Sequence, residues 1–361
     1  MPAFVATGLF TPRAEGQVGS FFPLQKPAGG CPVFPREADN FAFILHPRNP
    51  CRISRTGKLV SLLVVGSVAF DAIESPYGKV DRIIGGAATY FAVAASFFTH
   101  VNLVGIVGDD FSATDAMIFK NRKIDTAGLE RANGKCFFWS GKYSQHLNER
   151  ETLITELNVF AEFKPKLPEK FRNSKHVFLA NIAPDLQRDV LKQVKGSPKH
   201  VALDTMNYWI ERTPAELRET LKHVDILMIN DSETRQLSSE HNLLLAARHI
   251  FKLGPSTLIV KRGEYGAMMV DKRGVFCVPA FPLEEPHDPT GAGDSFAGGF
   301  MGYLAGCGAS NDAALRRAMV YGSVLGSFAV EEFGPERLRK LKRSEIESRA
   351  RHFLKLTQFK L

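Results

Sequence analysis

The stretch DPTGAGDSFAGGF, residues 288–300, combines closely spaced glycines with two carboxylates. Each glycine inside a helix costs about 1 kcal/mol relative to alanine, so helix formation alone does not account for this composition. The first N–H groups of a helix lack partners and bind anions, and glycine lets the backbone approach a phosphate closely. Asp294 directly follows Gly291, Ala292 and Gly293, where its carboxylate is placed to accept a proton from an attacking hydroxyl. The stretch therefore predicts an anion hole for a transferring phosphoryl group beside a general base.

Other interpretations fit this part of the sequence less well. A helix cap would explain Asp294 but not the glycines before it. The sequence contains no GxxxxGK[ST] motif, and its first apolar strand ends in GSVAFD instead of GxGxxG, so a P-loop and a Rossmann dinucleotide site are unsupported. The motifs HRD, DFG and GxSxG are also absent, which excludes an ordinary protein kinase and an ordinary serine hydrolase.

The composition limits the class of protein and its partners. The chain has 361 residues, 44% of them hydrophobic and 23% charged, which is typical of a soluble globular protein. The formal net charge is +8, but lysines and arginines are scattered among acids outside the basic stretch 337–343. We interpret that stretch as the solvated face of a terminal helix. We therefore expect a small anionic ligand and no nucleic-acid partner.

Cysteine usage and hydropathy bear on location. The five cysteines are odd in number and widely spaced, without a CxxC or Cys/His ligand pattern. This pattern favours a reduced, cytoplasmic protein without structural zinc. No apolar run approaches the roughly 20 residues that a membrane span requires, so no membrane partner is expected.

Residues 1–58 differ from the rest of the chain, because prolines recur there without a steady hydrophobic period. They predict an irregular N-terminal extension. A transit peptide and a start codon placed too early are alternatives, although few serines and frequent prolines argue against the first. The role of the extension is left open by the sequence.

The remaining chain alternates between apolar strands and amphipathic helices. Strands are expected at 59–67, 101–110, 176–182, 200–206, 225–231 and 257–263. Helices are expected at 85–98, 113–124, 185–194, 214–223 and 243–253. This alternation is typical of a parallel sheet covered by helices on both faces. We therefore predict a three-layer α/β domain over 59–345 and a C-terminal helical tail over 346–361.

Two segments, near 72–84 and 135–158, interrupt that alternation. Both alternate polar and apolar residues and contain aromatics, which suits antiparallel strands with one wet face. A small sheet of this kind over the parallel one would form a lid, and a lid excludes water from phosphoryl transfer. An edge extension used for packing is the alternative. Exposed strand edges also invite pairing, so a homodimer through the lid is plausible.

Two motifs resemble the signatures of the ribokinase-like (PfkB) carbohydrate kinase family. DPTGAGDSF is similar to the C-terminal signature, and GGAATYFAVAASFFTHVNLVGIVGDD is similar to the N-terminal one. The resemblance covers about residues 59–335, with both signatures in the family's order. It implies a ribokinase-like fold, ATP and Mg²⁺ as cofactors, and phosphorylation of a hydroxyl on a sugar or sugar-like substrate. A nucleoside kinase of the same fold and a catalytically silent ligand-binding homologue are the alternatives.

The resemblance also assigns roles at the phosphoryl end of the site. By position, Asp294 matches the family's catalytic base, and the three residues before it match its anion hole. Asn230 and Glu233, in NDSE, match the NxxE motif that helps to place Mg²⁺ and the phosphates, with Glu233 acting on the metal indirectly. A strand end followed by an ordinary helix cap is the alternative for NDSE.

Further positions match nucleotide and cation contacts of the family. The nucleotide contacts implied by position are Lys261, Gly263, Gly322 and Ser323. Tight helix packing explains the last two of these equally well. Asp288 and Thr290 match positions that build a monovalent cation site in potassium-activated members, so K⁺ is a third cofactor that the resemblance implies.

The substrate end is defined less sharply. Asp71 follows the first strand at the position of a family aspartate that binds substrate hydroxyls, and Gly85 and Gly86 match the double glycine beside the substrate. A carboxylate can accept hydrogen bonds from two neighbouring hydroxyls. Turn chemistry is the alternative for Asp71.

One departure from the family concerns Tyr90, which stands where many sugar kinases of the family have asparagine. A phenol cannot reproduce the paired donor and acceptor of an amide, so the substrate pocket is expected to differ there. Asn181 is a candidate to take over that role. Other candidates are Asp204 and Asn207 at strand ends and Phe138, Trp139 and Tyr143 in the lid.

Overall fold

The computed structural model describes residues 61–145 and 147–358. The chain divides into two units, Met1–Phe41 and Ala42–Leu361, and every described residue belongs to the second. The irregular extension predicted over 1–58 therefore lies outside the described residues. None of the helices in the described ranges is long and apolar enough to cross a membrane.

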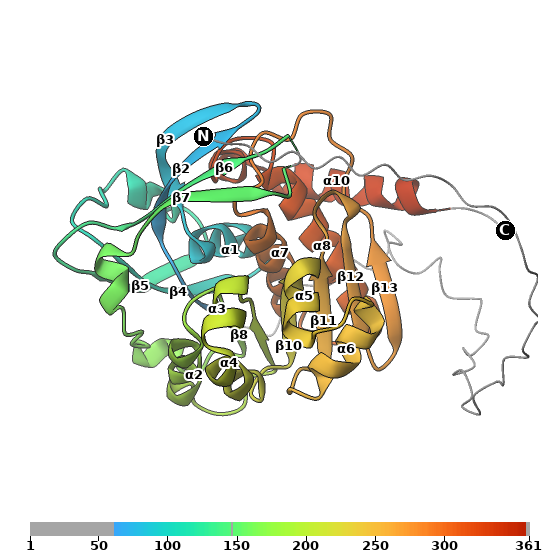
Figure 1. Ribbon diagram of the computed structural model, residues 1–361. Coiled ribbons are helices and arrows are strands. Elements are labelled where there is room, and N and C mark those ends of the chain that lie inside the picture. Colours follow the sequence, from blue (N-terminus) through green and yellow to red (C-terminus); the bar gives the residue numbers. More distant parts are fainter. Residues whose placement is uncertain (1–60, 146, 359–361) are drawn as a thin grey trace, which may run out of the picture. The chain divides into compact units, whose positions relative to one another are not determined.

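The core of the domain is a nine-stranded sheet in the order β13-β12-β11-β10-β9-β8-β1-β4-β5 (Figure 1). Its strands are β1 (Ser61–Val65), β4 (His100–Val107), β5 (Ile124–Arg131), β8 (His176–Leu179), β9 (His200–Leu203), β10 (Ile226–Asn230), β11 (Thr257–Lys261), β12 (Ala267–Asp271) and β13 (Gly274–Val278). Neighbours from β5 through β11 pair in parallel, whereas β12 and β13 are antiparallel. The central strands are buried on both faces because they consist mainly of apolar residues.

Helices cover both faces of this sheet, which confirms the predicted three-layer ribokinase-like fold. One face carries α1 (Ala87–Ser96), α7 (Ala292–Cys307), α8 (Asp312–Ala329), α9 (Glu336–Lys340) and α10 (Arg343–Thr357). The other carries α2 (Pro184–Gln193), α3 (Asn207–Arg212), α4 (Pro214–Leu221), α5 (Asp231–Ser238) and α6 (Leu243–Phe251).

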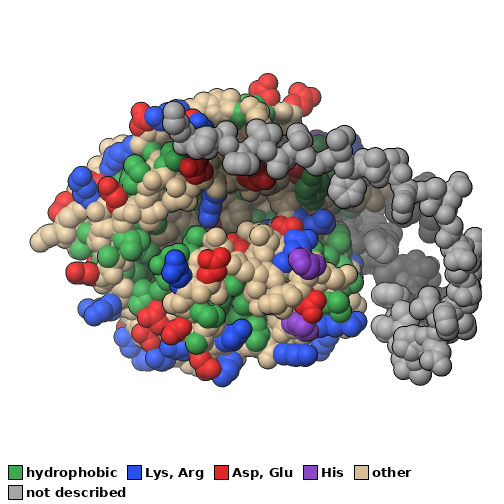
Figure 2. Space-filling view, in the orientation of Figure 1, with side chains coloured by type: hydrophobic (Ala, Val, Ile, Leu, Met, Phe, Trp, Pro, Cys, Tyr) green, Lys and Arg blue, Asp and Glu red, His purple; other side chains and the backbone are tan. Residues whose placement is uncertain are grey.

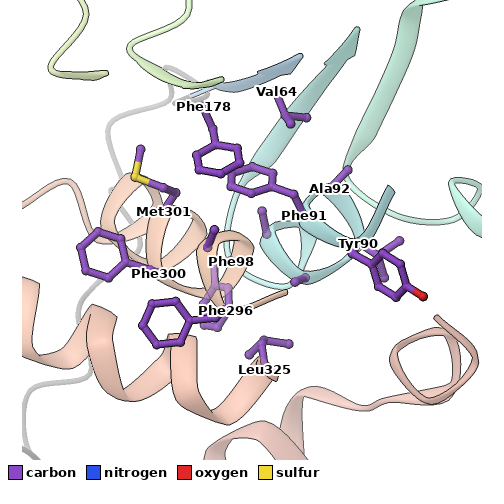
Figure 3. Packing of buried hydrophobic residues seen from close by; sticks show 14 of the residues in the cluster. Val64, Tyr90, Phe91, Ala92, Phe98, Phe178, Phe296, Phe300, Met301 and Leu325 are labelled. Carbon is purple, nitrogen blue, oxygen red and sulfur yellow. The ribbon is translucent and has the colours of Figure 1, made fainter. Parts of the chain in front are cut away.

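The packing of α7 explains two glycines of the 288–300 stretch. A Cβ on Gly298 would collide with the backbone carbonyl of Phe91 in α1, and one on Gly299 would lie 2.7 Å from the Tyr321 carbonyl in α8. Phe91 in turn stacks on Phe178 of β8, with ring centroids 4.1 Å apart (Figure 3). These glycines therefore let α7 lie close to both neighbouring helices.

The helix predicted over 113–124 was wrong. That segment holds only a short 3₁₀ turn, η2 (Asp115–Ile118), and β5 begins at its end. Asp115 accepts hydrogen bonds from the backbone and the hydroxyl of Ser112, and Asn121 adopts a left-handed conformation (φ 56°). Short polar side chains that bind the local backbone compete with a regular helix.

The lid is a separate sheet in the order β3-β2-β6-β7. Its strands are β2 (Ala69–Ser75), β3 (Gly78–Gly85), β6 (Phe137–Tyr143) and β7 (Arg150–Glu156). β2 pairs in parallel with β6, and the other two pairs are antiparallel. β7 is exposed along its whole length, whereas β2 is mostly buried. Tyr143 Oη lies 3.0 Å from Thr290 Oγ1, so the lid meets the loop that precedes α7.

Candidate active site

The glycine turn before α7 contains the residues that the sequence predicts to form an anion hole. Gly291 is the N-cap of α7 with a left-handed φ of 72°, and Ala292 opens the helix. The N–H groups of Gly293 and Asp294 lie in the first helical turn, which lacks intrahelical acceptors. A Cβ on Gly291 would collide with the ring of Tyr90. Glycine is therefore required at 291 by both the backbone conformation and the contact.

Asp294 lies in the first turn of α7 and is partly buried. Desolvation by the surrounding atoms raises the pKa of its carboxyl to about 6, and the nearby Asp204 carboxylate acts in the same direction. Lys261 and Arg150 oppose this rise in the pKa. A carboxyl with a pKa near neutrality is suited to accept a proton at physiological pH.

Asp71 occupies the other side of the site. Its side chain is 4% exposed, and a Cβ on Gly85 would collide with its carboxyl group. Burial raises the pKa of Asp71 to about 8, the charges of Asp288 and Asp294 add to the rise, and the Gly86 N–H opposes it. The double glycine at the start of α1 thus makes room for this carboxyl and donates to it. The structure brings Asp71, Asp288 and Asp294 close together.

Tyr90 is placed under the anion hole. The side chain is buried, and its ring faces Gly291. Its hydroxyl points away from the apolar cluster in Figure 3 and has no hydrogen-bond partner among the described residues. Burial, followed by the charges of Asp288 and Asp71, raises the pKa of this phenol well above its usual value. The ring therefore supports the anion hole, and only the hydroxyl is free to meet a substrate.

Asn230 and Glu233 form a capping box at the start of α5. Asn230 Oδ1 accepts from the Glu233 N–H at 2.7 Å, and Glu233 Oε2 accepts from the Asn230 N–H at 2.8 Å. The helix-cap interpretation of NDSE is thus present in the structure. The second carboxyl oxygen of Glu233 is left for other contacts, and burial raises the pKa of this group to about 7.

Lys261 is the last residue of β11, and Gly263 follows it in the next turn. The Lys261 ammonium forms an ion pair with Asp204, with 2.6 Å between Nζ and Oδ2. A Cβ on Gly263 would collide with the side chain of Asn148 in the lid loop, so this loop reaches the residues that follow β11. The surface in Figure 2 is hollowed beneath the lid strands.

The other predicted site residues are engaged mainly in local contacts. Asn181 accepts from the Trp209 indole at 3.0 Å. A Cβ on Gly322 would lie 3.0 Å from the Phe296 carbonyl, which favours helix packing as the role of Gly322. Its neighbour Ser323 is buried in the same helix, α8.

Asp288 organises the loop before α7. Its two carboxyl oxygens accept from the N–H groups of Thr290 and Gly334, each at 2.8 Å. Its side chain is fully buried, and burial raises the pKa of its carboxyl. These contacts give Asp288 a structural role in this loop, and a monovalent cation beside it and Thr290 stays a prediction.

Sequence reasoning missed Arg150 in β7. It pairs in register with Tyr143, and directly opposite residues of an antiparallel pair share one face of the sheet. Its guanidinium carbon lies 5.7 Å from the centre of the Trp139 ring, and the Trp139 position is in register with Asp71. Burial raises the pKa values of Asp71, Asp204, Glu233 and Asp294, and the Arg150 charge opposes each rise. No local motif marks this residue, because only the strand register places it over the site.

A comparison of the sequence with protein-family models identifies the family of the chain. The model described as pfkB family carbohydrate kinase matches residues 60–339. The chain belongs to this family. The predicted family and the predicted ATP-dependent kinase activity on a sugar-like or nucleoside hydroxyl are thereby confirmed.

Known relatives of this pfkB-family kinase include nucleoside kinases. The chain is 30% identical over 258 residues to a cytidine kinase of Thermococcus kodakarensis, covering 69% of this chain and 90% of the relative. The solved nucleoside kinase of Methanocaldococcus jannaschii superposes with a TM-score of 0.65 at 21% identity, over 82% of this chain and 99% of that one. A putative ribokinase II from E. coli, solved with ATP and Mg²⁺, gives a TM-score of 0.68 at 20% identity, over 81% and 100% of the two chains.

Proposed function

We propose that this pfkB-family kinase transfers the γ-phosphoryl group of ATP to a sugar hydroxyl of a nucleoside, with Asp294 as the general base. The observation that carries the proposal is the position of Asp294 in the first turn of α7, directly after the glycine turn that rests on Tyr90. Burial brings the pKa of the base to about 6, so it is largely ionised at neutral pH.

The reaction is an in-line displacement. The acceptor oxygen forms a bond to the γ-phosphorus, its proton passes to Asp294, and the bond from the γ-phosphorus to the bridging oxygen breaks to release ADP. The N–H groups of Gly293 and Asp294 stabilise charge on the transferring group. The Tyr90 ring packs against the turn at Gly291, so it supports the position of these N–H groups.

Mg²⁺ fits the donors that the site offers. Within the described ranges, no group of three or more His, Cys, Asp or Glu residues is arranged to hold a metal ion by itself. Mg²⁺ usually keeps several waters and binds through one or two carboxylates together with substrate phosphates. We assign Glu233 to the water shell of this ion, because one of its oxygens is committed to the capping box. The ion would neutralise charge on the phosphates.

A nucleoside is the acceptor that the observations favour within the sugar-like class. The buried Asp71 carboxyl is suited to neighbouring ribose hydroxyls. Trp139 lies in register with Asp71 on the lid, and an indole ring offers a surface for a nucleobase. The relationship to the T. kodakarensis cytidine kinase supports the same class.

We also propose a homodimer formed through the lid. β3 and β7 are the edges of the lid sheet, and Leu153 and Ile154 on β7 are 50% and 46% exposed. Unpaired strand edges with apolar side chains favour pairing with another chain. None of Cys136, Cys277 and Cys307 is joined in a disulfide, which fits the proposed cytoplasmic location.

The experiment measures ADP release with cytidine, other nucleosides, free ribose and hexoses as acceptors. We expect release with at least one nucleoside and much less with free sugars. Asp294→Asn should lower kcat by about 10²–10⁴-fold with ATP affinity nearly unchanged. Asp312→Asn is the matched control, because Asp312 is an acid in the first turn of the neighbouring helix α8. Tight binding of one acceptor without ADP release would instead support a catalytically silent protein, and unchanged turnover of Asp294→Asn would overturn the base assignment.

A further inference from the structure

A buried ion pair lies behind the anion hole. Lys261 Nζ and Asp204 Oδ2 are 2.6 Å apart, and the two side chains are only 16% and 8% exposed. Asp204 is held rigidly, since its other carboxyl oxygen accepts from the Thr205 N–H at 2.9 Å and its carbonyl accepts from Gln187 at 3.0 Å. Burying two charges is expensive, and such a pair contributes little net stability compared with apolar residues. The pair therefore calls for a functional explanation.

The position of the ammonium supplies that explanation. Lys261 Nζ lies 3.2 Å from the point that a Cβ on Gly293 would occupy. Gly293 is part of the anion hole, and the next residue is the base Asp294. The ammonium thus lies next to the first turn of α7, beside the N–H groups that the proposed function assigns to the transferring phosphoryl group. Its place at the end of β11, in register with Asn230, also puts it beside the capping box.

Lys261 keeps its positive charge at this position. Burial acts to lower the pKa of the ammonium, but the carboxylates of Asp204, Glu233 and Asp294 outweigh it and raise the pKa above its usual value. An ammonium has three N–H donors. Asp204 uses one of them in the structure. The remaining donors are available for an incoming anion.

We propose that Lys261 contacts the transferring γ-phosphoryl group of ATP and that Asp204 is the positioning residue that holds the ammonium there. This inference rests on the proposed phosphoryl transfer at Asp294. It assigns Asp204 to the lysine instead of to the substrate. It also explains why a strand-end aspartate is buried opposite the base.

Nucleotide binding tests the first half of the proposal. The affinities of Lys261→Met for a non-hydrolysable ATP analogue and for ADP are measured by calorimetry in the presence of Mg²⁺. We expect the affinity for the ATP analogue to fall about tenfold or more, the effect of losing a charge-assisted hydrogen bond, while ADP affinity changes little. Lys261→Arg keeps the cation and should recover part of the analogue affinity. An equal loss of ADP and analogue affinity would overturn the contact with the γ-phosphoryl group.

The pH dependence of kcat/KM tests the role of Asp204. Burial and then Asp204 raise the pKa of Asp294 to about 6, whereas Lys261 and Arg150 lower it. Asp204→Asn removes a negative charge and so lowers the pKa of Asp294. The acidic limb of the kcat/KM profile, where Asp294 becomes protonated, should therefore move to lower pH while kcat falls. Lys261→Met removes a positive charge, so the limb should move to higher pH. Opposite shifts are not expected from a general loss of structure.

Asp271→Asn is the control for burial. Asp271 is also a buried aspartate at a strand end and pairs with Arg273, but it lies at the opposite edge of the sheet. It should leave the acidic limb in place. The double variant Asp204→Asn/Lys261→Met removes both charges and covers the case in which either single variant folds poorly. If the wild type is active and Asp204→Asn has the same kcat and pH profile, this inference is overturned but the proposed function is not. A wild-type protein without kinase activity would overturn the proposed function.

Discussion

The main sheet buries ionisable groups at both ends of its parallel strands, which we call its carboxyl edge and its amino edge. The groups are charged at the carboxyl edge and neutral at the amino edge. At the carboxyl edge, Asp204 and Lys261 form a buried ion pair beside the anion hole. At the amino edge, His176 and His200 open β8 and β9, and their rings stack with Nδ1 atoms 3.2 Å apart. Desolvation acts at both edges. It is opposed by neighbouring charges at the carboxyl edge, whereas at the amino edge it keeps the histidines neutral.

Burial of ionisable groups has different consequences at the two ends of the strands, because only the groups at the carboxyl ends can contact a ligand. The carboxyl edge has the Lys261 ammonium, which can bind an anion, together with N–H groups that lack acceptors. At the amino edge, each histidine finds its partner in the other. We therefore expect variants at the carboxyl edge to alter catalysis and those at the amino edge to alter only stability.

After Asp294, the largest effect is expected at Gly291, and α7 itself offers the control. Gly291 and Gly308 cap the two ends of this helix with φ angles of 72° and 68°. A Cβ on Gly291 would collide with Tyr90, whereas one on Gly308 would meet nothing within 4 Å. Gly291→Ala should lower kcat by about 100-fold, because a displaced anion hole no longer fits the transition state.

Gly308→Ala should keep kcat and lose about 1 kcal/mol of unfolding free energy from backbone strain alone. Steady-state kinetics and urea unfolding of both variants provide the measurement. Equal kcat values for the two variants would show that the contact with Tyr90 does not position the anion hole.

The next effect concerns Arg150, which connects the lid to the carboxyl edge. Arg150→Met should lower kcat/KM by about tenfold or more, comparable to the loss of a charge-assisted hydrogen bond. Burial and Asp204 raise the pKa of Asp294 and Arg150 opposes the rise, so its removal should also shift the acidic limb to higher pH. Lys142→Met is the control, since Lys142 lies in the same lid hairpin and forms an exposed ion pair with Glu74 at 2.6 Å. Similar kinetics for both variants would place Arg150 outside the reaction.

Site residues could be predicted from the sequence where they are close together in the chain, and they were missed where they are far apart. The residues of the predicted anion hole and Asp294 are adjacent in the chain, so glycine and helix chemistry were enough to predict a site there. The Asp204–Lys261 pair joins positions 57 residues apart, and it exists only because strands β9, β10 and β11 lie side by side. Arg150 depends in the same way on the register of the lid strands.

The sequence singled out Tyr90 but did not predict the contact that its side chain makes. Its residue type signalled a departure from related kinases and pointed to the substrate pocket. The structure places its ring against Gly291, a contact between distant segments that no local pattern contains. The fold followed the same rule: continuous apolar runs predicted the central strands, whereas β5, a largely half-exposed strand at one edge of the sheet, and the β12–β13 hairpin at the other edge were missed.

A third prediction concerns the pH dependence of stability at the site. Burial raises the pKa of Asp71 from 3.8 to about 8, so the folded protein binds this proton more tightly than the unfolded chain does. The folded state therefore loses stability as the pH rises from about 4 to about 8. Asp71→Asn removes this titration, and its unfolding free energy relative to wild type should rise by roughly 3–4 kcal/mol between pH 5 and pH 8. Asp81→Asn, an exposed position in the same hairpin, should show no such rise in urea unfolding. A flat difference for Asp71→Asn would mean that this carboxyl is ionised throughout.

The smallest effect is expected at the amino edge, with the opposite sign. Burial lowers the pKa of His176 to about 3, and His200 and Lys199 add to the shift, so the unfolded chain binds the proton more tightly. Stability from this group is complete above about pH 6.5 and is lost as the pH falls below it. His176→Asn preserves a polar partner for His200 without titrating, so its unfolding free energy should fall by about 2 kcal/mol less than that of the wild type between pH 7 and pH 5. The exposed His223→Asn serves as control, and kcat should be unchanged in both variants. An altered kcat in His176→Asn would contradict the separation of the two edges, because it would connect the amino edge to catalysis.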